Sequence, residues 1–204
     1  MSIYEEKPEQ AQQPKPKQEK PVGDYESLHN QIGTQLDYED SVIFLTDEIE
    51  SHTLTEFIIR MRSLLQNRKD KSAPVNLMIN SPGGDIYEMF GIIDYIESLD
   101  VKVNTICRGR AMSAAALILA SGTGKRLASK RSTVMLHEGS SVQVGKYSDL
   151  KVASKQADKM EGMVRDLLAE KTKKDANWWA ENTKTDLWLN ANEALDLGLI
   201  DDIG

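Results

Sequence analysis

Ser113 and His137 are the two residues whose types and surroundings could carry out nucleophilic chemistry. Ser113 lies in the stretch ICRGRAMSAAALILASG, residues 106–122, where it begins an apolar helix directly after a strand. A free hydroxyl is a weak nucleophile, so it needs a base to accept its proton and a third group to orient that base. His137 closes the apolar segment TVML, whereas His29 and His52 lie in polar surroundings typical of surface or capping residues. The sequence therefore suggests Ser113 with His137 as a nucleophile and base.

Both residues also have ordinary structural explanations. Serine is common at the start of helices, where its side chain caps a free N–H group, and a histidine at the end of a buried strand can be a satisfied core residue. The local sequence RAMSAAA is not the G-x-S-x-G motif of α/β-hydrolases. However, the first turn of a helix leaves N–H groups unpaired, which suits an oxyanion hole beside Ser113. These residues alone leave the choice open.

The turn INSPGGD, residues 79–85, is a second candidate for a functional backbone. Two successive glycines after a buried strand expose N–H groups and allow a chain or ligand to approach closely, although a simple tight turn explains them as well. A dinucleotide site would need G-x-G-x-x-G, which the turn lacks, so phosphate binding is the weaker alternative.

Three strand and helix pairs must position these residues. Strands are expected at 41–46, 75–81 and 101–109, and each precedes an amphipathic or apolar helix, at 51–66, 86–99 and 113–121 respectively. Repeated strand and helix units favour an α/β fold with parallel strands and helical crossovers. Two short strands, KRLAS and STVMLHE, follow.

The carboxyl-terminal part of the sequence predicts one long helix and one short helix. Residues 149–172 form an amphipathic helix whose apolar stripe is Leu150, Ala153, Ala157, Met160, Val164, Leu167 and Leu168. Asn190, followed three residues later by Glu193, is a capping-box signature that starts a final helix after a short strand.

Composition excludes several classes of protein. The 204 residues suit one domain at 23–204, preceded by a disordered arm at 1–22 that is rich in Gln, Lys, Glu and Pro. A net charge of -7 with no dense basic patch argues against nucleic acid as a partner. The single cysteine, Cys107, excludes an internal disulfide. Its position in the apolar segment VNTIC predicts a buried thiol. The absence of an apolar run of about 18 residues and of a secretory signal leads us to expect a cytoplasmic protein without membrane contact.

Five separated motifs carry a resemblance to a known family. INSPGGD, GRAMSAAALILASG, GKRLASKRSTVMLHEG and TDLWLNANEALDLGLID, with the strand that follows the first of them, stand in the order and at the intervals of the Clp protease proteolytic subunit family. The resemblance to these ClpP-like serine peptidases covers about residues 38–204. It implies a crotonase-like α/β fold of repeated strand-strand-helix units with a long protruding handle helix, and a serine endopeptidase that needs no metal or organic cofactor.

The resemblance also implies a role for individual residues. Ser113 is the nucleophile, His137 the general base and Asp186 the orienting acid, although from the residues alone Asp149 or Asp175 would serve equally well. The backbone N–H groups of Gly84 and Ala114 form the oxyanion hole. The expected partners are peptide and unfolded protein substrates, further copies of the chain in two stacked heptameric rings, and an AAA+ unfoldase for folded substrates.

The chain departs from the family pattern in places. Asn76 and Met78 occupy positions where the family usually presents tyrosines to an unfoldase, and M-S-A-A-A and H-E-G replace A-S-M-G-A and H-Q-P. These differences put unfoldase docking and the substrate groove in question and suggest a divergent relative, such as a viral one. The alternatives are a phage head-maturation protease, a non-catalytic ring subunit, and an acyl-CoA enzyme of the same broad fold.

Overall fold

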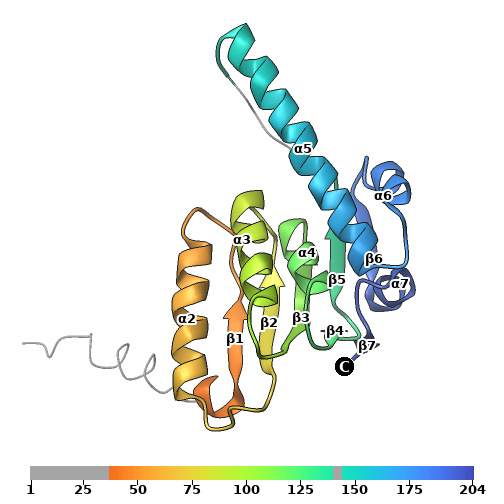
Figure 1. Cartoon of the computed structure of the whole chain (residues 1–204). Coiled ribbons are helices and arrows are strands. Elements are labelled where there is room, and N and C mark those ends of the chain that lie inside the picture. The colour runs from red at the N-terminus through yellow and green to blue at the C-terminus, as the bar shows by residue number, and fades with distance from the viewer. Residues whose placement is uncertain (1–36, 140–143) are drawn as a thin grey trace, which may run out of the picture. The chain divides into compact units, whose positions relative to one another are not determined.

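The computed structural model describes residues 37–139 and 144–204, so the predicted arm at 1–22 lies outside the described residues, as does His29. The strands and helices alternate along most of the chain (Figure 1). In chain order they are β1 Val42–Leu45, α2 Thr53–Asn67, β2 Val75–Ser81, α3 Ile86–Glu97, β3 Val103–Met112, α4 Ala114–Ala120, β4 Arg126–Ala128, β5 Thr133–Leu136, α5 Tyr147–Lys171, α6 Ala176–Asn182, β6 Leu187–Asn190, α7 Ala191–Leu197 and β7 Asp202–Ile203.

The strands form one sheet in the order β1-β2-β3-β4-β7, with β5 pairing to β3 and β6 pairing to β5. All pairs are parallel except β5 with β6, which is antiparallel. The predicted α/β class with parallel strands is therefore confirmed. The long strand β3 holds two neighbours on the same side, because its first half pairs with β4 and its second half with β5.

Helices α2, α3 and α4 pack on one face of the sheet (Figure 1). Alternate residues of β2 are fully buried on that face, as the period of two in a strand requires: Val75, Leu77 and Ile79. Every residue of α4 is buried, which explains why its sequence, AAALILA, has no polar face. The start of α4, where Ser113 lies, is thereby fixed against the core.

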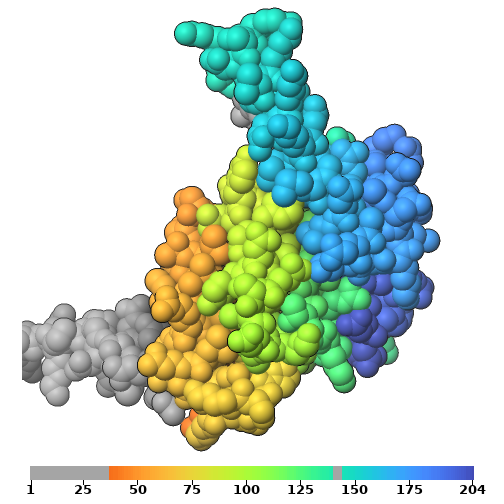
Figure 2. Space-filling view, viewed as in Figure 1, coloured from red at the N-terminus to blue at the C-terminus, as the bar shows by residue number. Residues whose placement is uncertain are grey.

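The long helix α5 is buried only in its carboxyl-terminal half. Met160 and Leu168 are buried there, whereas Tyr147 and Val152 are 74% and 70% exposed. The amino-terminal half extends beyond the sheet and its helices (Figures 1 and 2). The predicted apolar stripe runs along the whole helix, but the rest of the described fold covers only its carboxyl-terminal half.

Helix α6, strand β7 and the length of β3 differ from the sequence expectations. Helix α6 was not expected, although Asp175 caps it by accepting a hydrogen bond from the Trp178 N–H. Strand β3 continues past residue 109 to Met112, because its last residues pair with β5. The short strand expected near Asn190 is β6, which pairs antiparallel with β5, and the capping box of Asn190 with Glu193 is confirmed.

Candidate active site

The register of three neighbouring strands brings Ser113, His137 and Asp186 to one edge of the sheet. Strands β3 and β5 are parallel with Met112 opposite Met135, so Ser113 and the residues after β5 leave the sheet at the same edge. Strand β6 runs antiparallel to β5 with Leu136 opposite Leu187. Continuing this pairing by one residue sets His137 opposite Asp186.

Ser113 does not cap the helix that it precedes. It occupies the N-cap position of α4, but its side chain makes no capping hydrogen bond. Instead, Ser113 Oγ lies 2.9 Å from His137 Nε2, a hydrogen-bond distance. The Ser113 N–H donates to the Met135 carbonyl at 2.7 Å, which ties the serine to β5 and hence to the histidine. The hydroxyl is directed to a base and not to the backbone.

The backbone at Ser113 is strained. Its φ of 52° with ψ of −124° lies outside the regions that a residue with a side chain normally occupies. Such conformations cost about 1–3 kcal/mol and persist where the surrounding fold imposes them, often at functional sites. Here a tight change from strand to helix imposes it, and the result is a hydroxyl presented at the sheet edge.

Asp186 lies near the histidine without a full hydrogen bond. Its Oδ1 is 3.8 Å from His137 Nδ1, and the side chains of Asp186 and His137 are 54% and 28% exposed. Catalytic hydrogen bonds are often long before substrate binds. The two alternative acids lie elsewhere: Asp175 caps α6, and Asp149 sits in the first turn of α5 with Ser148 as its neighbour.

The turn at 82–85 lies against the serine. A Cβ built on Gly83 would overlap the Met112 carbonyl and come within 2.9 Å of the Ala114 nitrogen. Gly84, with φ of 147°, passes so close to the Ile49 carbonyl that a Cβ would overlap it. Both positions therefore require glycine. The family resemblance pointed to Gly84, whereas no signal in the sequence gave Gly83 a role of its own.

Free backbone donors flank the serine. Ile49 holds the turn from the outside, since its N–H donates to the Gly83 carbonyl and its carbonyl accepts from the Asp85 N–H. Among the described residues, neither the Gly84 N–H nor the Ala114 N–H has a hydrogen-bond partner. The role of Ile49 is not visible in the sequence, because nothing in the residues around it marks a contact with a turn more than 30 positions away.

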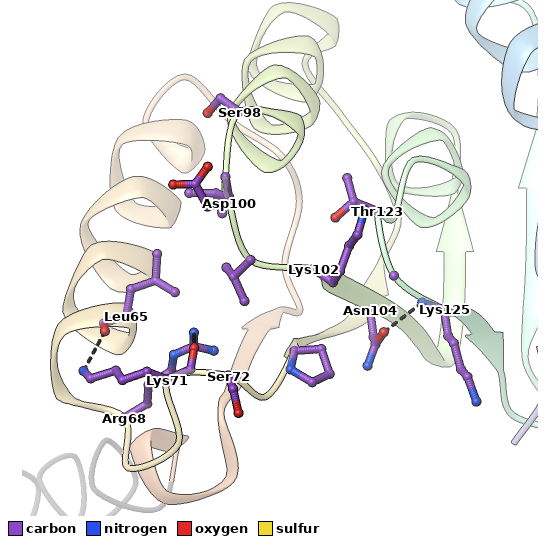
Figure 3. Close-up of a pocket in the computed structure, with 14 residues that line it drawn as sticks. Leu65, Arg68, Lys71, Ser72, Ser98, Asp100, Lys102, Asn104, Thr123 and Lys125 are labelled. Atoms are coloured by element: carbon purple, nitrogen blue, oxygen red, sulfur yellow. Dashed lines mark hydrogen bonds between the residues drawn. The ribbon is translucent and has the colours of Figure 1, made fainter.

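A separate cavity of about 830 Å³ lies at the opposite edge of the sheet (Figure 3). Its lining includes Pro74, Lys102 and Lys125, which come directly before β2, β3 and β4. Several of its polar groups already bond within the chain: Lys71 Nζ donates to the Leu65 carbonyl, and the Lys125 N–H donates to the Asn104 side chain. This cavity does not belong to the Ser113 site.

The remaining candidate residues are accounted for within the described chain. The side chain of His52 is 61% exposed, and it does not cap α2. Cys107 is fully buried, as expected, and burial raises the pKa of its thiol to about 11. In residues 37–139 and 144–204, no group of three or more His, Cys, Asp and Glu side chains could hold a metal ion.

A serine bonded to histidine at the carboxyl edge of a mainly parallel sheet, beside free backbone donors, is typical of serine hydrolases. The comparisons narrow this class. The Clp protease family model matches residues 26–204. The ATP-dependent Clp protease proteolytic subunit of Porphyromonas gingivalis (strain ATCC BAA-308 / W83) is 32% identical over 165 residues, covering 80% of this chain and 73% of that protein.

The chain belongs to the Clp protease family and is a peptidase of that family. The resemblance stated from the sequence is therefore confirmed. No helix in the described part of the chain is long and apolar enough to cross a membrane.

Proposed function

We propose that this chain is a serine endopeptidase that hydrolyses peptide bonds without ATP, with Ser113, His137 and Asp186 as its catalytic triad. The observation that carries the proposal is the 2.9 Å contact between Ser113 Oγ and His137 Nε2. Ser113 has a strained backbone and makes no capping bond, so its placement has no evident structural use. A nucleophile bonded to its base explains both features.

The first half of the reaction acylates the serine. His137 Nε2 accepts the Ser113 proton as Oγ attacks the peptide carbonyl carbon, and the carbonyl π electrons move to its oxygen. The N–H groups of Gly84 and Ala114, which have no partner among the described residues, donate to that oxyanion. The protonated His137 then gives its proton to the leaving amine as the peptide C–N bond breaks.

The second half releases the acyl group. Water attacks the ester carbonyl, His137 accepts the proton from water, and Ser113 leaves and regains the proton. Asp186 holds His137 Nδ1–H and stabilises the imidazolium form, which requires the 3.8 Å separation to shorten when substrate binds. The M-S-A-A-A sequence at the nucleophile keeps both backbone donors, because these come from the main chain.

The test is Ser113→Ala, measured by hydrolysis of fluorogenic peptides and by covalent labelling with a fluorophosphonate. Loss of the nucleophile should lower kcat by several orders of magnitude while the assembly stays folded. Asp186→Asn should also be strongly impaired, whereas Asp149→Asn, at the rejected acid position, should retain full activity. Labelling of another serine, or full activity of the Ser113→Ala variant, would show that the assignment is wrong.

We further propose that the chain assembles with copies of itself, in the two stacked heptameric rings that the family resemblance implies. The exposed half of α5 supports an interface, since Tyr147 and Val152 are large apolar side chains at 74% and 70% exposure. Val152→Glu should lower the mass of the particle in native mass spectrometry, whereas Lys155→Glu, an exposed polar position on the same helix, should not. An unchanged mass for Val152→Glu argues against this interface.

The last part of the proposal concerns how strongly an AAA+ unfoldase docks on this chain. On the sheet face away from the helices, Phe44, Met78 and Ile106 form an apolar row across β1, β2 and β3. The next row is polar, because the Asn104 amide donates to the Asn76 side chain at 2.9 Å. Aromatic anchors usually supply most of the energy of such an interface, and the apolar row has only one aromatic residue, Phe44. We therefore expect weak docking of an unfoldase of the usual type.

A mixture with a bacterial unfoldase, ATP and a tagged fluorescent protein tests this expectation. The tagged protein should keep its fluorescence, while small peptides are hydrolysed in the same tube. A folded domain must first be unfolded against its ~5–15 kcal/mol of stability, so it cannot enter an enclosed chamber unaided. Rapid loss of fluorescence that depends on Ser113 would contradict weak docking and show that the chain degrades folded proteins together with an unfoldase.

A further inference from the structure

We infer that Glu161, on α5, is a positioning residue that holds the segment carrying the base, residues 137–139. The inference rests on the proposed function. The Gly139 N–H, two residues after His137, donates to Glu161 Oε2 at 3.2 Å. The Glu161 side chain is only 17% exposed, and its other oxygen lies 4.0 Å from Arg165 Nε one turn further along the helix.

The segment needs such a contact because it lies outside the sheet. Strand β5 ends at Leu136, so the ladder with β3 and β6 no longer fixes the residues that follow. Two backbone donors anchor them instead. The Glu138 N–H donates to the Thr183 carbonyl at 2.7 Å, and the Gly139 N–H donates to Glu161. Gly139 has no side chain to pack, so this hydrogen bond is what secures it.

The two anchors connect the base to different parts of the fold. Thr183 directly follows α6 as its C-cap and precedes Asp186 by three residues, so its bond couples the base segment to the loop that bears the acid. Glu161 comes from the half of α5 that packs on the core, so its bond couples the same segment to the long helix. A carboxylate acceptor makes the second bond charge-assisted and stronger than a neutral one.

Removal of the carboxylate should loosen the imidazole relative to Ser113. Small displacements of a catalytic group, of about 1 Å, lower rates by up to about a hundredfold. We expect Glu161→Ala to reduce kcat and the rate of fluorophosphonate labelling by about tenfold, a partial displacement on that scale. The KM for a short peptide should change by less than about twofold, since Glu161 would act on the base and not on bound substrate.

The experiment compares three variants of the full chain. Glu161→Gln keeps an oxygen that accepts the Gly139 N–H, so it should recover most of the activity lost in Glu161→Ala. Asp166→Ala removes an exposed carboxylate from the same helix and should match the wild type. Hydrogen–deuterium exchange of the peptide containing residues 137–139 should be faster in Glu161→Ala than in the other two proteins, at equal particle mass.

Several results would overturn the inference: unchanged activity and exchange in Glu161→Ala, equal losses in the Gln and Ala variants, or a loss that only follows dissociation of the particle. The exchange measurement does not depend on catalysis. If the wild type neither hydrolyses peptides nor labels at Ser113, the proposed function fails, while exchange at 137–139 still shows whether Glu161 holds the segment.

Discussion

The hydroxyl of Ser132 closes a gap in the sheet just before Ser113, and Ser132→Ala measures what that closure contributes. Strand β3 pairs with β4 through Cys107 and with β5 from Arg110 onward. Between these points Gly109 adopts a φ of 104°. Ser132 Oγ donates to the Cys107 carbonyl at 3.0 Å and accepts from the Gly109 N–H at 3.3 Å. One side chain thus replaces the missing ladder bonds.

The cost of the substitution can be worked out from these contacts. The Cys107 carbonyl keeps a second bond from the Ser129 N–H, so the alanine variant leaves only the Gly109 N–H without its partner. Gly109 is exposed, so water can bond to its free N–H, and the cost is that of the two lost hydrogen bonds, at about 0.5–1.5 kcal/mol each. At about 2 kcal/mol, and about 2–4 °C per kcal/mol for a domain of this size, Tm should fall by about 4–8 °C.

Ser121 supplies a matched control for the same chemical change. Ser121 and Ser132 are 1% and 3% exposed, but the Ser121 hydroxyl has no partner in the described part of the chain. Removing an unpaired buried hydroxyl costs nothing or stabilises slightly, so Ser121→Ala should keep or raise Tm. The Tm values of both variants are measured by thermal unfolding at one protein concentration. Equal shifts in the two variants would refute the role of the Ser132 bonds.

Three further predictions concern other parts of the fold. Gly84→Ala should nearly abolish fluorophosphonate labelling, because the new methyl group overlaps the Ile49 carbonyl and displaces the proposed oxyanion donor; labelling at the wild-type rate contradicts this. Cys107, with its pKa raised to about 11 by burial, should resist iodoacetamide at pH 8 until the protein is denatured, and native labelling would argue against burial. Arg126 lowers the pKa of Asp201 through hydrogen bonds, so their pair stabilises the fold above pH ~4, and this contribution disappears as pH falls through the lowered pKa. Asp201→Asn should therefore unfold at lower Tm at pH 7 but lose less Tm than the wild type between pH 5 and pH 3, and parallel Tm curves would exclude the linkage.

The sequence predicted those strands and helices whose residue patterns lie within the element itself. The strand expected at 75–81 matches β2 in full, and the Asn190 capping box starts α7 as its residue pattern indicates. Helix α6 escaped because its seven residues, ANWWAEN, are too short to show a helical period. Its aromatic residues act through the tertiary fold: Trp179 is fully buried and its Nε1–H donates to Thr172 at 3.0 Å.

The contacts of Glu161 and Ser132 could not be predicted from the sequence for a different reason. Each acts through a backbone group that is distant in sequence, 22 residues away for Glu161 and Gly139, and 23 residues away for Ser132 and Gly109. A backbone N–H has no residue identity, so no motif marks its acceptor. Such contacts emerge only once the sheet and α5 are assembled.

The identity of the proposed acid shows most clearly what the fold adds to the sequence. In the sequence, Asp149, Asp175 and Asp186 are equivalent carboxylates downstream of the base. The antiparallel pairing of Leu136 with Leu187 separates them, since the next position along both strands sets His137 opposite Asp186. Side chains alternate between the two faces of a strand, so a shift of β6 by one residue would bring a different residue opposite His137 and turn the carboxylate to the other face. No short turn joins β5 to β6, because the whole of α5 and α6 lies between them, so turn residues do not determine this register. The register depends on how the chain between the two strands folds, so the fold identifies Asp186 as the proposed acid, whereas short motifs indicated the proposed nucleophile and base.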